Sequence, residues 1–304
     1  MTRARVIVGL QAALAALAVV VLGAGLLVSV RAVSFHPPSP LELAAACSRF
    51  ALPDVSAVSV IVLALGSLTL AVVALSARSL FRRARATRRF LVALRVTGVG
   101  PNGTLLFASD APHAFCAGFL RPRTYLADGT LKALRDEELD AVLAHEAHHC
   151  RLRDPLRIAL AQAIGDGLFF LPAARRLARC YGALAELAAD GAALRVAGAE
   201  PLASALLAFE RADPAVVGIA PERVEHLLGD RLSWELPVAL IVWSLAVLAA
   251  LAAVLWRVSE AATHAMLNLP LLAAQSCMLV MAVLPVLLGA GAVLSSRRLV
   301  GRRS

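Results

Sequence analysis

The sequence is poor in aromatic residues, in lysine and in cysteine. Of its 304 residues 5% are aromatic, and Lys132 is the single lysine, so arginine carries nearly all of the net charge of +9. No aromatic residues are interleaved with the arginines, which argues against direct nucleic-acid binding. The hydrophobic fraction is 60%, more than the roughly half that is typical of soluble proteins, and the arginines border long apolar runs. We therefore expect the basic residues to face a lipid bilayer.

The few cysteines exclude two kinds of site. Their number is odd, and no CxxC or CxxxC spacing occurs, so neither a disulfide framework nor a cysteine zinc site is expected. The sequence instead favours reduced, buried thiols in a cytoplasmic or membrane setting. The five residues are Cys47, Cys116, Cys150, Cys180 and Cys277.

Charged residues are also absent from four segments long enough to cross a bilayer, which takes about 20 residues. The first remains apolar for longer than a signal peptide and lacks a clear small-residue cleavage site, so we expect a retained span. The four predicted spans are Val6–Val30, Val55–Ala77, Leu236–Trp256 and Leu269–Leu294.

The arginines predict the orientation of these spans. They precede the first span and follow the second and the fourth, whereas the other two connections are nearly neutral. Because cytoplasmic loops are enriched in arginine, four spans with both termini in the cytoplasm fit every cluster. We expect a mainly α integral membrane protein of a bacterial inner or plasma membrane. It would comprise a membrane region at 1–80, a cytoplasmic α+β domain at 81–233, and a second membrane region with a basic tail at 234–304.

Two patterns stand out within the cytoplasmic segment. Short, partly alternating stretches between Leu94 and Leu126, separated by turn residues, predict a small sheet, and the sequence becomes helical after Gly129. A fifth apolar run, 158–171, is only about 14 residues long and contains Asp166, which fits a buried or re-entrant helix better than a span.

A concentration of histidines marks the centre of that segment, in the stretch "AHEAHHCRLRDP". Asp136 is a good N-cap for a helix that should run to about Arg153. Asp154 and Pro155 are then expected to be the cap and the first residue of the next helix. On such a helix His145 and His149 leave the same face and can bind one zinc ion.

Glu146 follows the first of these histidines and can act as general base on a zinc-bound water, which is the HExxH arrangement. We interpret His148 as a neighbour at the edge of this face. A helix face with histidines at random is the plain alternative.

A catalytic zinc usually has a third protein ligand. The stretch "AELAADGAAL" supplies Glu186 as that ligand, and Asp190, four residues on, could accept the Nδ1 proton of a ligand histidine. On its own this pair would suit a solvated helix face, but HExxH favours the metal role. The two parts can meet only if the run 158–171 does not cross the membrane, so we predict a helical hairpin turning near Pro172.

From Ala114 to Val196 the chain resembles the BlaR/MecR-type integral-membrane zinc metallopeptidases, which are gluzincins distantly similar to HtpX-type proteases. The resemblance rests on "AFCAGFLRPRTYL", "LRDEELDAVLAHEAHHCRLRDPL", "FFLPAARRLARC" and "ELAADGAAL". It implies a zincin-like metalloprotease domain, with His145, His149 and Glu186 as zinc ligands, Glu146 as catalytic base and Asp190 behind the ligands.

The resemblance further implies that the strand around Gly118 and Pro122 borders the substrate cleft. Arg223 or His226 would be candidates to stabilise an oxyanion, although surface helix charge is the plainer reading of both. The best-known members carry an extracellular penicillin-binding sensor domain after the last span, but this chain stops at Ser304, so β-lactam sensing is not expected.

Three functions remain open on the sequence. The first is a zinc endopeptidase at the cytoplasmic face that cleaves a protein, by resemblance a BlaI/MecI-type transcriptional repressor, in signal transduction. The second is an HtpX-like protease for membrane-protein quality control. The third is a non-catalytic membrane sensor or scaffold with a structural zinc, against which the presence of Glu146 argues, because a structural site does not need a base.

Overall fold

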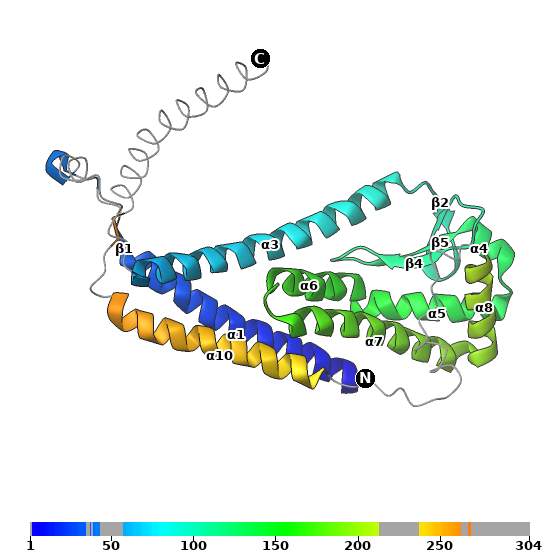
Figure 1. The fold of residues 1–304 in the computed structure, drawn as a ribbon. Coiled ribbons are helices and arrows are strands. Elements are labelled where there is room, and N and C mark those ends of the chain that lie inside the picture. Colours follow the sequence, from blue (N-terminus) through cyan, green and yellow to red (C-terminus); the bar gives the residue numbers. More distant parts are fainter. Residues whose placement is uncertain are drawn as a thin grey trace, which may run out of the picture. The chain divides into compact units, whose positions relative to one another are not determined.

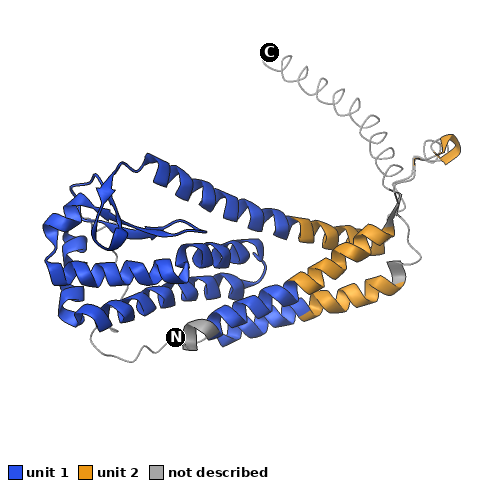
Figure 2. Ribbon diagram, turned by 180° about the vertical axis from the view of Figure 1, so that it is seen from behind, with its two compact units in different colours: residues 1–18, 71–248 blue, residues 19–70, 249–304 orange. Residues whose placement is uncertain are grey.

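The computed structural model describes residues 2–34, 37, 39–42, 57–212, 237–262 and 267–268. These are mainly helical, with one four-stranded sheet and one two-stranded sheet (Figure 1). The chain divides into two compact units, of which the first holds residues 1–18 and 71–248 and the second holds 19–70 and 249–304 (Figure 2).

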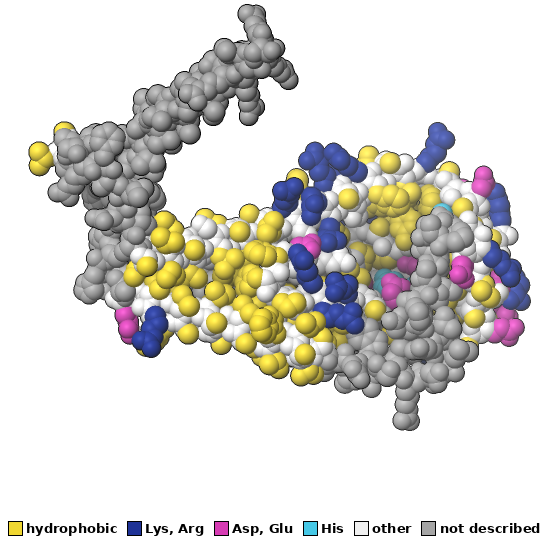
Figure 3. Space-filling model, in the orientation of Figure 1, with side chains coloured by type: hydrophobic (Ala, Val, Ile, Leu, Met, Phe, Trp, Pro, Cys, Tyr) yellow, Lys and Arg dark blue, Asp and Glu magenta, His cyan; other side chains and the backbone are white. Residues whose placement is uncertain are grey.

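Three described helices are long and apolar enough to cross a membrane. They are α1 (Thr2–Ala32), α3 (Ala57–Ala93) and α10 (Val238–Ala262). Their apolar stretches coincide with the first three predicted spans, whereas the fourth, Leu269–Leu294, lies outside the described residues. Basic side chains, which in α3 are all arginines, gather over the C-terminal part of this helix (Figure 3).

The second unit packs α1 against α3 through polar contacts in an apolar setting. The hydroxyl of Ser29 donates to the carbonyl of Val62 at 2.7 Å, and that of Thr69 donates to the carbonyl of Leu22 at 3.0 Å. Gly66 faces Ser29 so closely that a Cβ there would lie 2.9 Å from the serine oxygen. Two short strands, β1 (Val33–Ser34) and β6 (Leu267–Asn268), pair in parallel.

The first unit contains a four-stranded sheet in the order β2-β3-β5-β4. The β2/β3 and β4/β5 pairs are antiparallel, and the β3/β5 pair is parallel. Strand β4 therefore lies at one edge. The strands are β2 (Val96–Val99), β3 (Leu105–Phe107), β4 (Ala114–Ala117) and β5 (Arg123–Ala127), with a 3₁₀ turn at Pro101–Gly103.

Five helices follow the sheet in the same unit. The five are α4 (Asp128–Ala133), α5 (Asp136–Leu152), α6 (Asp154–Gly167), α7 (Pro172–Ala197) and α8 (Ala199–Ala212). Helix α5 packs against helix α8. Buried Ala141 and Val142 of α5 contact Leu202 and Ala205 of α8.

The apolar run 158–171 forms most of α6 and the turn into α7, so the chain makes a helical hairpin at Pro172. The two helices approach closely, because a Cβ at Gly165 would lie 3.2 Å from the Cα of Arg175. Asp166, the acid inside the run, accepts hydrogen bonds from Ser79 (2.6 Å) and Arg83 (3.1 Å) on α3. The charge of this residue is thus paired within the unit.

The start of α5 differs by one residue from the prediction. Asp136 is the first helical residue, and Arg135 is the N-cap. The carboxylate of Glu138 accepts hydrogen bonds from the Arg135 backbone (2.9 Å) and guanidinium (2.7 Å), and from the Ser204 hydroxyl on α8 (2.5 Å). These bonds, of which those to the Arg135 side chain contribute most, lower the pKa of Glu138 to about 2. Glu138 therefore both caps α5 and ties it to α8.

We expect Glu138→Gln to lower the stability of the purified protein by about 1–2 kcal/mol near neutral pH, because a charged cap is lost. The folded-state pKa lies below the unfolded value of about 4.5. The stabilisation is therefore complete above that pH and is lost as the pH falls toward 2. Thermal unfolding followed by circular dichroism from pH 7 to pH 3 should show the difference from wild type shrinking at acid pH. Glu137→Gln, an exposed acid in the same turn, should change little; an equal effect of both variants would contradict the capping role.

Candidate active site

Two histidines of α5 point toward one another. His145 and His149 are one helical turn apart, so their side chains leave the same face. Their Nε2 atoms lie 3.2 Å apart, and both side chains are buried. Two imidazole nitrogens held this close need a shared partner between or beside them.

The third group comes from α7. One carboxylate oxygen of Glu186 lies 3.6 Å from Nε2 of His145, and the other lies 3.6 Å from Nε2 of His149. One ligand atom from each residue lies within 4.8 Å of the others. In a tetrahedral zinc site with bonds of about 2.0–2.1 Å, ligand atoms are about 3.3 Å apart. The observed separations fit such an ion, and the helical hairpin makes the meeting of α5 and α7 possible.

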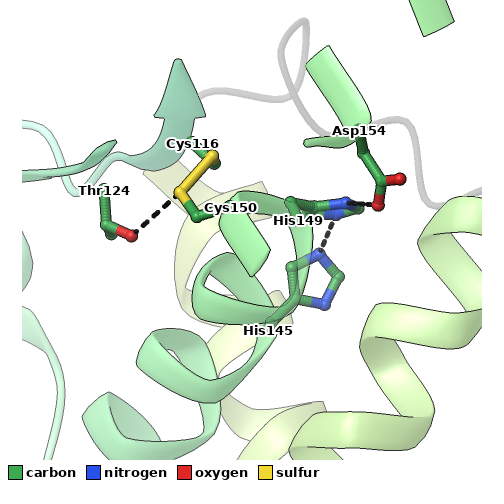
Figure 4. The surroundings of a disulfide bond; sticks show 6 residues. All are labelled: Cys116, Thr124, His145, His149, Cys150 and Asp154. Atoms are coloured by element: carbon green, nitrogen blue, oxygen red, sulfur yellow. Dashed lines mark hydrogen bonds and ion pairs between the residues drawn. A yellow bond between two sulfur atoms is a disulfide. The ribbon is translucent and has the colours of Figure 1, made fainter. Parts of the chain in front are cut away.

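Each imidazole is held from behind by a carboxylate. Nδ1 of His145 lies 3.0 Å from Oδ1 of Asp190. Nδ1 of His149 lies 2.9 Å from Oδ2 of Asp154, and Figure 4 shows this second contact. The hydroxyl of Tyr181 donates to the other oxygen of Asp154 at 3.3 Å. These carboxylates favour a proton on Nδ1 of each imidazole and turn both Nε2 atoms, which lie 3.2 Å apart, toward the same point. With the Glu186 carboxylate, three acceptors converge where a cation would stabilise them.

The same negative groups set the protonation of the site. Burial, the largest effect, lowers the pKa of His145, but the hydrogen bonds to Asp190 and Glu186 outweigh it and raise the pKa to about 9. Burial raises the pKa of Glu146, which suits a group that takes up protons. His148 lies outside the cluster, with Nδ1 3.3 Å from an Arg151 guanidinium nitrogen, and burial lowers its pKa.

A cavity of about 510 Å³ opens onto these groups. Figure 3 shows histidine and acidic side chains in a hollow of the surface. The walls come from α3, β4 and its following turn, α5, α6 and α7. The lining residues are Arg83, Ala86, Thr87, Phe115, Cys116, Phe119, His145, Glu146, His149, Asp154, Pro155, Ile158, Ala159, Gln162 and Glu186.

The predicted cleft residues lie in the turn between β4 and β5. Gly118 has φ 108°, a backbone conformation that favours glycine, and lines a separate cavity of about 310 Å³. The neighbouring residues Phe115, Cys116 and Phe119 are those that line the site cavity, while Pro122 lies just before β5. Arg223 and His226, the oxyanion candidates, lie outside the described residues.

One residue of the site was assigned the wrong role from sequence. Asp154 was expected to cap the next helix, but the N-cap of α6 is Arg153, and the Asp154 side chain makes no capping bond. Arg153 adopts a left-handed conformation (φ 55°), which turns the chain sharply and brings Asp154 beside His149. The sequence Asp-Pro is typical of a helix start, and it gave no indication that Asp154 contacts His149 of the preceding helix.

The expectation of unpaired thiols was also wrong for two cysteines. Cys116 on β4 and Cys150 on α5 form a disulfide, with their Cα atoms 5.8 Å apart (Figure 4). Their separation of 34 residues carries no sequence signal, and the odd number of cysteines argued against it. Cys180 is a buried free thiol, as expected, and Cys47 and Cys277 lie outside the described residues.

The comparison with protein families agrees with this geometry. A model described as the BlaR1 peptidase M56 family matches residues 28–216, more than half of the chain. The chain belongs to the BlaR1 peptidase M56 family. Membership indicates a metallopeptidase, and the three apolar helices indicate a membrane protein. The expected kinship with BlaR/MecR-type peptidases is therefore confirmed.

A curated relative of this M56 peptidase is the protease HtpX of Nitrosococcus oceani. The two are 33% identical over 72 residues, which is 23% of this chain and 24% of the relative. The match thus spans about a quarter of the relative's length and supports the distant similarity to HtpX-type proteases. No solved structure matches the chain.

The contact between Asp154 and His149 gives a prediction for metal affinity. In this M56 peptidase, Asp154→Asn keeps the shape of the side chain but removes the charge that holds the Nδ1 proton of His149. We expect zinc to bind about 10–100-fold more weakly. Competition with a chromophoric chelator on the detergent-purified protein measures this affinity. Asp140→Asn, an exposed acid of the same helix, is the matched control; equal zinc affinity for the two variants would contradict the role of Asp154.

Proposed function

We propose that this protein is an integral-membrane, zinc-dependent endopeptidase that hydrolyses a peptide bond of a protein substrate at the cytoplasmic face. The observation that carries the proposal is the convergence of His145, His149 and Glu186 beside Glu146 in one cavity. The metal would be held by the two histidines and Glu186. When bound, zinc supplies Lewis acidity, which polarises a carbonyl group and acidifies water.

Glu146 is the proposed catalytic base. Burial raises the pKa of its carboxyl, and the backbone N–H of Cys116 hydrogen-bonds the carboxylate and acts in the opposite direction. Glu146 can therefore take a proton from the attacking water and pass it to the leaving amine. Asp190 and Asp154 hold the Nδ1 sides of the two histidines, so that both Nε2 atoms are directed toward the point where the metal would bind.

Strand β4 is the proposed substrate-binding element. It lies at the edge of the sheet, and its residues Phe115 and Cys116 line the cavity that contains Glu146. An extended peptide can add to an edge strand through backbone hydrogen bonds. This mode would place the peptide along the cavity without demanding a particular sequence.

Two substrate classes are proposed. A BlaI/MecI-type repressor would make the protein a signal transducer, and a gene for a small winged-helix repressor beside its own gene would favour this reading. The similarity to the protease HtpX favours a second candidate, proteolysis for membrane-protein quality control. A non-catalytic zinc-holding sensor is a third, and it leaves Glu146 without a role.

The role of Glu146 is tested by substitution. We expect Glu146→Gln, which keeps the volume and loses the base, to lower hydrolysis of an unfolded protein such as casein by about 10²–10⁴-fold, with zinc content unchanged. His145→Ala should lose both zinc and activity, whereas Glu137→Gln should retain both. Hydrolysis is followed with a fluorescent substrate and zinc by atomic absorption. Unchanged processing by Glu146→Gln would rule out the proposed mechanism.

The proposed orientation gives a second test. Fusion of a reporter after Ala212, at the end of α8, places it on the side of the membrane that holds the site. Green fluorescent protein should fluoresce there and alkaline phosphatase should be inactive, because the former folds in the cytoplasm and the latter needs an oxidising compartment. The same fusions after Arg31, at the end of the first apolar helix, should give the reverse. An active phosphatase after Ala212 would contradict the cytoplasmic site.

A further inference from the structure

The disulfide joins the proposed substrate-binding strand to the helix that carries the two histidines. Cys116 belongs to edge strand β4, and Cys150 directly follows His149 on α5 (Figure 4). The hydroxyl of Thr124 on β5 lies 3.5 Å from the sulfur of Cys150. The bond therefore fixes the position of β4 relative to the last turn of the histidine helix.

Both cysteines are within reach of small thiols. Each is only half-buried, and Cys116 lines the cavity of about 510 Å³ that opens onto the site. Cys180 differs, because it is 2% exposed and packs among apolar side chains of α6 and α7. A small reagent that enters the cavity can thus reach the Cys116–Cys150 pair without unfolding the protein.

The arginines and the disulfide point to different compartments unless the bond is reversible. The arginines of α3 place the domain in the cytoplasm, where thiols are kept reduced and lasting structural disulfides are rare. Cytoplasmic disulfides are usually transient and regulatory or catalytic. We propose that Cys116 and Cys150 form a reversible thiol–disulfide site, and that its oxidation switches the peptidase on. The proposal rests on the proposed function and orientation.

The chemistry balances with a low-molecular-weight thiol such as glutathione. One thiolate attacks a sulfur of the pair, forms a mixed disulfide and releases one cysteine thiolate. A second glutathione then attacks the mixed disulfide and releases the other cysteine. The protein gains two electrons and two protons, and two glutathiones become one oxidised glutathione. Oxidation of the protein by oxidised glutathione is the reverse reaction.

The oxidised state is the one in which the site is assembled. In the disulfide-bonded structure the three acceptors of the metal site converge, the cavity is open, and the backbone N–H of Cys116 contacts Glu146. Reduction removes the covalent link between β4 and α5. The strand that positions both the base and the substrate then gains freedom of movement. Misplacement of a reacting group by about 1 Å can cost about a hundredfold in rate.

The test uses the full chain in lipid nanodiscs, loaded with zinc and equilibrated in buffers of defined glutathione ratio. Differential alkylation and mass spectrometry measure the oxidised fraction of each cysteine. Hydrogen exchange over residues 114–117 measures the freedom of β4, and casein hydrolysis measures activity. We expect activity to rise about 10–100-fold with the oxidised fraction, exchange in β4 to slow, and zinc content to stay constant.

The variants separate the pair from other thiols. Cys116→Ser and Cys150→Ser should each stay at the reduced level in every buffer, whereas Cys180→Ala should respond as wild type does. A pair that never oxidises, that stays oxidised throughout the glutathione series, or whose oxidation leaves β4 exchange and hydrolysis unchanged would overturn the proposal. Higher activity in the reduced state would also overturn it.

Failure of the proposed function gives a different result. If no state hydrolyses protein, while the pair titrates and exchange in β4 slows on oxidation, the peptidase assignment fails and the redox site stands. In growing cells, rapid acid quenching followed by alkylation should find both thiols reduced, and brief treatment with the thiol oxidant diamide should pair them. A pair already oxidised in untreated cells would show a static disulfide and contradict reversibility.

Discussion

The two histidines of α5 face each other because a carboxylate holds the Nδ1 side of each imidazole. Asp190 and Asp154 come from two other helices, and each occupies the Nδ1 side of one imidazole. This leaves two Nε2 atoms and the Glu186 carboxylate together in a small volume. Converging acceptors repel one another in a buried site, and a bound cation reverses that cost. The metal site therefore requires that α5, α6 and α7 pack so that these groups lie close together.

That condition explains the path of the chain from α5 to α7. The histidines occupy the end of α5, Asp154 is the first residue of α6, and Glu186 and Asp190 lie one turn apart in the middle of α7. The sharp turn at Arg153 and the hairpin at Pro172 bring these three places together over some 45 residues of sequence. Small residues on α6, such as Gly165, allow the hairpin helices to approach closely. The folding of this segment and the assembly of the site are thus one process.

The sequence predicted those parts of the site that lie at helical spacing. His145 and His149, and likewise Glu186 and Asp190, are four residues apart, and the structure brings both pairs to the same point. Contacts that depend on a turn, or on residues of two different elements, have no regular spacing in the sequence and were not predicted. Asp154 looked like a helix cap, and the Tyr181 hydroxyl that contacts it had no visible partner in the sequence.

The same distinction applies to the fold. The strands were recognisable from alternation and turn residues, but their order, which places β4 at the edge, follows from pairings between residues far apart. Cys116 and Cys150 meet because β4 packs against α5, which is likewise a contact between residues far apart in the sequence. The odd number of cysteines argued against a disulfide, but the number alone does not tell which two cysteines lie close together in the fold. Their positions on packed elements are what distinguish them.

Helix α3 belongs both to the apolar helices that could cross a membrane and to the wall of the site cavity. Its first part is apolar and suits a span, and from Ala71 onward it belongs to the unit that holds the site. Arg83 pairs with Asp166 of α6 and also hydrogen-bonds Gln162, and both Arg83 and Gln162 line the cavity that contains Glu146. Gln162 and Asp166, two polar residues of the otherwise apolar run in α6, are therefore paired with α3. A helix that is long and apolar enough to span the bilayer thus supplies one wall of the cavity in which hydrolysis is proposed to occur.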